Sequence, residues 1–373
     1  VAMQFLYGMI FVSFMTFGLL VSYIALLFWV LSMFPILRDG TAWLREYLLR
    51  KVNGIYFMCA ASLVHFFRTP LYVHHISKDQ IFNDEEILMI CNHRTRVDII
   101  FAGWCYASLF RSFPFLSVIL KDDLKKIPLF GWCMQIIMYI FLSRNKAADL
   151  PHLKKMLQYA KSTGRNTNYF LFPEGTDLSE TRKSESHAYS KAKGLKELNY
   201  VMYPKAAAFS TCLESLRAGT HTVVHDLTVA YRDYQQGERA SEKAILLGHF
   251  PKEIHLFVRK FQISDIPESE AEAKEWLTNI FLQKETLLQQ FYEEGVISSS
   301  PFDQVTSTHQ ISLAKRFYSF IQFLFLTFII FFLAYKIHFV RYLYLLHILI
   351  GFCTPFFGGF DQLEFFFAKT NLT

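Results

Sequence analysis

The first 37 residues carry no charged side chain, and this feature constrains the chain more than any other. From Val1 to Leu37 there is no Asp, Glu, Lys or Arg, and the first charge is Arg38. About 20 apolar residues are enough to cross the hydrocarbon core of a bilayer. A cleavable signal peptide has an apolar core of only about 7–15 residues. The run therefore predicts a membrane anchor, either as one long tilted helix or as a span followed by an interfacial segment.

Two further apolar runs lie near the other end of the chain. Residues 317–335 and 342–360 are both uncharged, and each is 19 residues long, about the length of one span. The connection between them is short and contains Lys336 and Arg341, so the two runs predict a hairpin. Pro355, Gly358 and Gly359 interrupt the second run. This run therefore either crosses the bilayer fully or breaks and re-enters it.

Charge and cysteine usage indicate the side of the membrane and the redox compartment. Lys and Arg near span ends favour the cytoplasmic side, and such residues flank the apolar runs at Arg38, Arg45, Arg50, Lys51, Lys315 and Arg316. We therefore expect the middle of the chain in the cytosol. A net charge of +6 suits an anionic membrane surface, and we find no nucleic-acid-binding motif. The six cysteines contain no C-x-x-C pair, which predicts a reduced compartment and no zinc site.

The middle of the chain has the pattern of a mixed α/β domain. Short aliphatic and aromatic runs predict strands at 86–91, 169–172, 227–231 and 253–259. Helices are predicted at 99–110, 122–143 with an interruption near Pro128, 149–162 and 206–217. This alternation predicts a mixed central sheet flanked by helices. The expected domains are an anchor with an interfacial segment (1–67), the α/β domain (68–265), an amphipathic helix with a linker (266–308) and the hydrophobic hairpin (309–373).

The segment "CNHRTRVD", residues 91–98, follows the first predicted strand and holds a candidate catalytic pair. If the strand ends at Cys91 and a helix begins near residues 95–97, His93 lies in the turn and Asp98 in the first helical turn. The carboxylate then fixes the imidazole tautomer and leaves the other ring nitrogen as a base. Asn92 is expected to hold the turn. A solvated surface histidine is the alternative interpretation of this spacing.

A second set of polar residues follows other apolar runs. In "FPEGTD", residues 172–177, Glu174 ends the strand, Gly175 permits a tight turn and Thr176 offers a hydroxyl and a main-chain N–H to a phosphate. Arg144 follows "IFLS", and Lys121 precedes a basic stretch. Cations on separate segments predict an anionic substrate. The stretch containing Arg182, Lys183, Lys191, Lys193 and Lys196 is interpreted as a solvated loop, with phosphates or anionic headgroups as the alternative partners. His74 and His75 are not accompanied in the sequence by the further residues that a metal site needs, and they are interpreted as structural.

The motifs "NHRTRVD", "FLSR", "FPEGT" and "VMYPKAAAF" (residues 201–209) resemble, in order and spacing, the four blocks of the glycerophospholipid acyltransferases. The longer stretches around them are most similar to the lysocardiolipin and lysophosphatidylinositol acyltransferase branch. The resemblance implies His93 as general base and Asp98 as its orienting partner. It also implies a lysolipid-binding set of Asn92, Lys121, Arg144, Glu174, Gly175 and Thr176.

The resemblance further implies acyl-CoA as co-substrate, no cofactor or metal, and residence in the endoplasmic reticulum or another endomembrane. One departure concerns Asp177, because many relatives that act on lysophosphatidic acid carry Arg at this place. The change disfavours a bare phosphomonoester and suits a phosphodiester with a headgroup. The alternatives are a catalytically idle lipid-binding subunit with the same fold and a serine hydrolase. Against the hydrolase, this sequence lacks the G-x-S-x-G motif in which such enzymes carry their nucleophilic serine.

Overall fold

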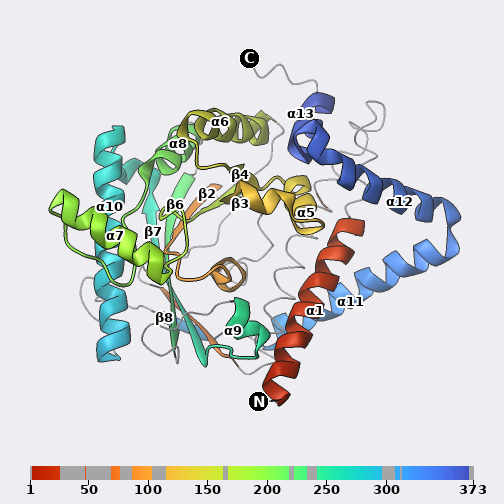
Figure 1. Cartoon of the computed structure of the whole chain (residues 1–373), viewed down its shortest axis with the longest axis horizontal. Helices are drawn as coiled ribbons and strands as arrows, with labels where there is room; N and C mark the ends of the chain where they lie inside the picture. The colour runs from red at the N-terminus through yellow and green to blue at the C-terminus, as the bar shows by residue number, and fades with distance from the viewer. Residues whose placement is uncertain are drawn as a thin grey trace. The chain divides into compact units, whose positions relative to one another are not determined.

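The computed structural model describes residues 2–25, 47, 69–75, 86–102, 115–162, 167–217, 222–232, 242–295, 307–310 and 313–368 (Figure 1). The chain forms two compact units. One contains residues 1–11, 63–111 and 168–312, and the other contains residues 12–62, 112–167 and 313–373. The predicted interfacial segment, most of the predicted helix 99–110 and most of the linker lie outside the described residues.

The first unit is built on a mixed sheet with the strand order β5-β2-β6-β7-β1-β8. β2 lies parallel to β5 and β6, and β6 is antiparallel to β7. The continuous apolar sequence of β2 fits this place, since residues 87–91 are fully buried between two neighbours. The predicted mixed sheet is confirmed. Its strands are β1 (Leu71–His75), β2 (Glu86–Cys91), β5 (Thr167–Leu171), β6 (Thr222–Arg232), β7 (Glu253–Gln262) and β8 (Ser307–Gln310).

Helices flank this sheet, and the predicted amphipathic helix is the longest of those described in the unit. It is α10 (Glu270–Gln289), which begins at Ser269, where Oγ accepts a hydrogen bond from the Glu272 N–H at 3.2 Å. Its Trp276 ring stacks on Phe209 at 5.8 Å between ring centroids. Figure 1 shows α10 alongside the sheet. The other elements are α7 (Glu180–Lys193), α8 (Ala206–Leu216), α9 (Glu242–Leu246), the 3₁₀ turn η2 (Ile263–Asp265) and the π-helical turn η3 (Gln290–Glu294).

The second unit corrects one prediction. Residues 122–143 do not form an interrupted helix but a 3₁₀ turn η1 (Asp122–Lys126), helix α5 (Phe130–Ile136) and strand β4 (Ile140–Leu142). β4 lies parallel to β3 (Phe115–Lys121), which was not predicted. A short apolar run has the same appearance in a buried helix and in a buried strand, so pairing with β3 decides its conformation. Helix α6 (Lys146–Ser162) follows, close to its predicted position.

Apolar helices occur at both ends of the chain: α1 (Ala2–Ala25), α11 (Leu313–Lys336), α12 (His338–Cys353) and, after the turn η4 (Thr354–Phe357), α13 (Phe360–Ala368). Within the described residues, one stretch, 338–357, is long and apolar enough to cross a membrane by length and composition. Only 17% of it is buried, unlike the core helix of a soluble protein. The helix ends before Gly358 and Gly359, which have φ of 80° and 115°, so the second run is not one continuous helix; whether it spans the bilayer or re-enters stays a prediction. Beyond these glycines, α13 docks on α5, where the Phe360 N–H donates to Gln135 Oε1 at 2.9 Å.

Candidate active site

The turn after β2 is anchored by Asn92. Its Nδ2 donates to the Val229 carbonyl at 3.1 Å, and its Oδ1 accepts from the Val229 N–H at 2.8 Å. Val229 lies on β6, the neighbour of β2, so this amide replaces the next pair of ladder hydrogen bonds. The side chain is fully buried. Asn92 therefore holds the turn as expected, and its contact with substrate stays a prediction.

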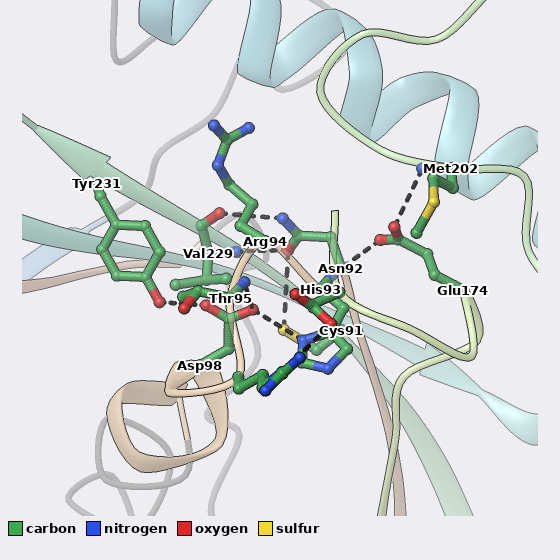
Figure 2. A network of polar contacts seen from close by, with 12 residues as sticks. Cys91, Asn92, His93, Arg94, Thr95, Asp98, Glu174, Met202, Val229 and Tyr231 are labelled. Atoms are coloured by element: carbon green, nitrogen blue, oxygen red, sulfur yellow. Dashed lines mark hydrogen bonds and ion pairs between the residues drawn. The ribbon is translucent and has the colours of Figure 1, made fainter. Parts of the chain in front are cut away.

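The next residue makes the contact that the H-x4-D spacing predicted. His93 Nδ1 lies 3.1 Å from Asp98 Oδ2, and the Thr95 N–H donates to the same oxygen at 2.9 Å (Figure 2). Asp98 begins the helical segment 98–102 and is fully buried, whereas 16% of the His93 side chain is exposed. A buried carboxylate accepts hydrogen bonds, so it holds the imidazole in the tautomer with hydrogen on Nδ1.

The His93 ring has a defined orientation. Its face stacks on Phe172 with ring centroids 4.1 Å apart and an interplanar angle of 23°. With hydrogen on Nδ1, the lone pair of Nε2 is the basic site, and no described residue pairs with it. An imidazole oriented in this way, with a partly exposed face, can take a proton from a bound hydroxyl group.

Glu174 binds main-chain groups of two segments. Its Oε1 accepts from the His93 N–H at 2.8 Å, and its Oε2 accepts from the Met202 N–H at 3.1 Å. Both carboxylate oxygens therefore bind main chain, and only 2% of the residue is exposed. A contact of Glu174 with the lysolipid stays a prediction. Glu174 joins the turn of His93 to the segment that begins at Val201.

This burial leads to a prediction about pH. Burial raises the pKa of Glu174 to about 8, although the N–H groups of His93 and Met202 act in the opposite direction. The folded chain then keeps a proton that the unfolded chain releases near pH 4.5. The contribution of Glu174 to the free energy of unfolding is therefore complete below that pH and is lost as the pH rises through about 8, with a slope of up to about 1.4 kcal/mol per pH unit.

We expect Glu174→Gln, which cannot titrate, to show a shallower fall of the thermal unfolding midpoint between about pH 5 and 8 than the parent chain in the same detergent. The exposed Glu185, on α7, provides a matched control as Glu185→Gln, which should follow the parent. Parallel curves for Glu174→Gln and the parent would contradict the buried, protonated carboxyl group.

The turn after Glu174 is crossed by a lysine. Gly175 has φ of 75°, the left-handed conformation that favours glycine. The Nζ and Cδ atoms of Lys205 lie 3.4 Å from the place where a Cβ on Gly175 would be. Asp177 forms an ion pair with Arg96, with 3.7 Å between Oδ1 and Nε. Two cations thus border this turn, and neither was predicted as a site residue. A role for Gly175 and Thr176 in binding phosphate stays a prediction.

Lys121 and Arg144 belong to the second unit. Lys121 pairs with Asp123, and its hydrogen bond and charge lower the pKa of the Asp123 carboxyl group. Arg144 follows β4 and has φ of 70°, unusual for a residue other than glycine. The participation of both in substrate binding stays a prediction.

His74 makes a buried structural contact, in line with its interpretation from the sequence. Its Nε2 lies 2.9 Å from Nδ1 of His255, and His255 Nε2 lies 3.0 Å from Glu253 Oε2. Among the described residues there is no group of three or more His, Cys, Asp or Glu side chains that could hold a metal ion.

Three partners of the site, Val229, Tyr231 and Met202, were not predicted. Val229 and Tyr231 lie two residues apart on β6, so they face the same side of the sheet. The predicted strand 227–231 already implied that these two residues share a face, but the sequence does not show which strand becomes its neighbour. Met202 contributes only its main-chain N–H, and no side-chain pattern could have marked it.

Comparisons with known proteins agree with these features. Residues 72–232 match the family model described as Acyltransferase, and residues 244–326 match Acyltransferase C-terminus. Lysocardiolipin acyltransferase 1 of Danio rerio is 36% identical over 219 residues, which cover 58% of this chain and 55% of that protein. Lysophosphatidylinositol acyltransferase 10 of Caenorhabditis elegans is 32% identical over 305 residues, 78% of this chain and 77% of that protein. This chain therefore spans little more than half the length of the first relative.

A solved structure is also similar. It is the crystal structure of the 1-acyl-sn-glycerophosphate (LPA) acyltransferase PlsC from Thermotoga maritima, with a TM-score of 0.42 and 15% sequence identity. The match covers 74% of this chain and 95% of that one.

Proposed function

Because the chain belongs to the glycerophospholipid acyltransferase family, in the branch of the lysocardiolipin and lysophosphatidylinositol acyltransferases, we propose that it transfers a fatty acyl group from acyl-CoA to a hydroxyl group of an anionic lysophospholipid. The observation that carries this proposal is the contact of 3.1 Å between His93 Nδ1 and the buried Asp98. An idle lipid-binding subunit would have no need of an oriented base.

The proposed reaction uses His93 twice. Nε2 removes the proton from the lysolipid hydroxyl as its oxygen attacks the thioester carbonyl, which gives a tetrahedral intermediate with a negatively charged oxygen. The intermediate collapses, the carbon–sulfur bond breaks, and the imidazolium returns the proton to the CoA thiolate. Asp98 stabilises the imidazolium between the two steps. The products are the diacylated phospholipid and free CoA.

The acceptor is proposed to be a lysophosphatidylinositol- or lysocardiolipin-type lipid. Two observations support an anionic acceptor with a headgroup. Lys205 crosses Gly175 next to the catalytic turn, and Asp177 stands paired to Arg96. A carboxylate at this turn repels the second charge of a phosphomonoester more than the single charge of a phosphodiester. Lys121 and Arg144 are proposed to complete the anion-binding set.

We further propose that the enzyme works at the bilayer of the endoplasmic reticulum or another endomembrane, with its catalytic unit in the cytosol. The apolar and largely exposed stretch 338–357 supports membrane attachment. Both substrates carry long acyl chains, so attachment lets the lysolipid reach the site from the bilayer without passing through water.

The proposal is tested with purified full-length chain in detergent, supplied with acyl-CoAs of several chain lengths and a panel of lysolipids. The acceptors are lysophosphatidylinositol, lysophosphatidylglycerol, monolysocardiolipin and lysophosphatidic acid. Turnover is expected with the phosphodiester acceptors and less with lysophosphatidic acid. Lipid binding without turnover on any acceptor would instead favour the idle subunit.

Neutralising Lys205 provides a prediction about specificity. Lys205→Met is expected to raise the KM for the anionic lysolipid about 5-fold, because a hydrogen bond from this exposed lysine contributes about 1 kcal/mol. The kcat should change much less than the KM, since the proposed role of Lys205 is to bind the anionic group and not to move a proton. Lys193→Met, on the exposed end of α7, is the matched control. An unchanged KM in Lys205→Met would remove this lysine from the binding site.

A further inference from the structure

A tyrosine from β6 completes the surroundings of Asp98. The Tyr231 hydroxyl donates to Asp98 Oδ1, the oxygen that does not contact His93 (Figure 2). Tyr231 is 2% exposed, and its ring packs edge-on against Phe101 with centroids 5.8 Å apart. Its main-chain N–H donates to the hydroxyl of Tyr292 at 3.0 Å. The hydroxyl of Tyr231 is therefore held at one place by both its ring and its backbone.

The hydrogen bonds of Asp98 divide between its two oxygens. Oδ2 receives the His93 Nδ1–H and the Thr95 N–H, and Oδ1 receives the tyrosine hydroxyl. Because the residue is fully buried, no water replaces a lost donor at Oδ1. A carboxylate oxygen without a donor in such a place binds a proton more readily.

Tyr231 remains a donor at any pH relevant to the reaction. Burial raises the pKa of the Tyr231 hydroxyl well above its usual value, and the neighbouring charge of Asp98 acts in the same direction. The hydroxyl therefore stays neutral and does not place a second negative charge beside Asp98.

We propose that Tyr231 is a positioning residue of the acyl transfer: its hydroxyl supplies the hydrogen bond at Oδ1 that keeps the Asp98 carboxylate oriented toward His93, without contact with either substrate. This inference rests on the proposed function, since it assigns a role within the same reaction. It extends the catalytic apparatus from the H-x4-D segment to β6, 133 positions further along the chain.

The test is Tyr231→Phe, which removes one oxygen atom. We expect kcat to fall about 10-fold, while the KM values for acyl-CoA and lysolipid stay within about 2-fold. The acid limb of the kcat/KM profile should move to higher pH, because the Asp98 carboxylate no longer shares its negative charge with the tyrosine hydroxyl and attracts the proton on His93 more strongly. Tyr159→Phe is the matched control, since its buried hydroxyl also donates to a carboxylate, Glu364, and both residues belong to the other unit.

A second substitution avoids any loss of packing. 3-Fluorotyrosine at position 231 keeps the ring and the hydroxyl but makes the hydroxyl a stronger donor, so the acid limb should move to lower pH. An acid limb that stays in place in both variants would overturn the positioning role. Activity remaining in His93→Ala would instead overturn the proposed function itself, so the two failures are distinguishable.

Discussion

Replacing His93 by alanine is expected to lower the kcat of acyl transfer by about 10²–10⁴-fold. The substitution removes the base that takes the proton from the lysolipid hydroxyl and later returns it to the thiolate. Substrate binding should persist, because the residues proposed to bind the anionic group are not changed by this substitution. The rate is measured as release of CoA thiol, or as formation of labelled phospholipid, with purified protein in detergent.

The fold of this variant must be shown to be intact. The main-chain N–H of residue 93 still donates to Glu174, and 16% of the native side chain is exposed, so the thermal unfolding midpoint should change little. His187→Ala is a matched control on α7, where the ring contacts the Leu198 carbonyl. Activity in a folded His93→Ala variant within about 3-fold of the parent would exclude His93 as the base.

The sequence predicted those parts of the fold whose pattern is local. β2 and β7 were found because their apolar runs are buried over most of their length. β1 was missed because its two histidines interrupt the apolar pattern that marks a buried strand. In the structure His74 forms a hydrogen bond with His255 from the neighbouring β7. The interpretation of the basic stretch from Arg182 as a loop was wrong. It lies largely in α7, whose few buried positions leave no apolar periodicity, although Ser179 and Gly194 cap its ends.

The candidate site divides in the same way. The contact between His93 and Asp98 was predictable because five residues and a strand-to-helix turn define it. The supports of that contact come from residues distant in sequence: Glu174, Val229 and Tyr231 approach only through strand pairing. A single sequence shows the residue types but not which strands become neighbours.

Helix α10 supplies a further support that sequence patterns did not reveal. Glu285 accepts hydrogen bonds from the main-chain N–H groups of residues 199–201 at 2.6–3.1 Å, just before Met202. The preceding residue, Lys284, forms an ion pair with Asp226 on β6 and donates to the carbonyl of Leu227. Two consecutive side chains thus hold the strand of Tyr231 and the segment that Glu174 binds.

Lys284→Met is therefore expected to destabilise the fold by about 3–5 kcal/mol. Lys284 and Asp226 are 0% and 1% exposed, so the variant leaves a buried carboxylate with Arg259 as its remaining cation. Burial by itself raises the pKa of Asp226, but Lys284 and Arg259 outweigh it and hold that pKa below its usual value. The loss is measured by thermal or denaturant unfolding in detergent.

The double variant Asp226→Asn/Lys284→Met separates the charge from the packing. Removing both charges avoids an uncompensated buried carboxylate, so this variant should recover part of the stability lost in Lys284→Met. Arg259 tolerates the change, since its Nη1 also donates to Gln283 at 2.5 Å and 12% of its side chain is exposed. A double variant that is less stable than Lys284→Met would instead mean that Asp226 still stabilises the fold through Arg259 when Lys284 is absent, so that the carboxylate is not uncompensated. In either case activity should fall together with the fraction of folded protein, because Lys284 holds β6, the strand that carries Val229 and Tyr231.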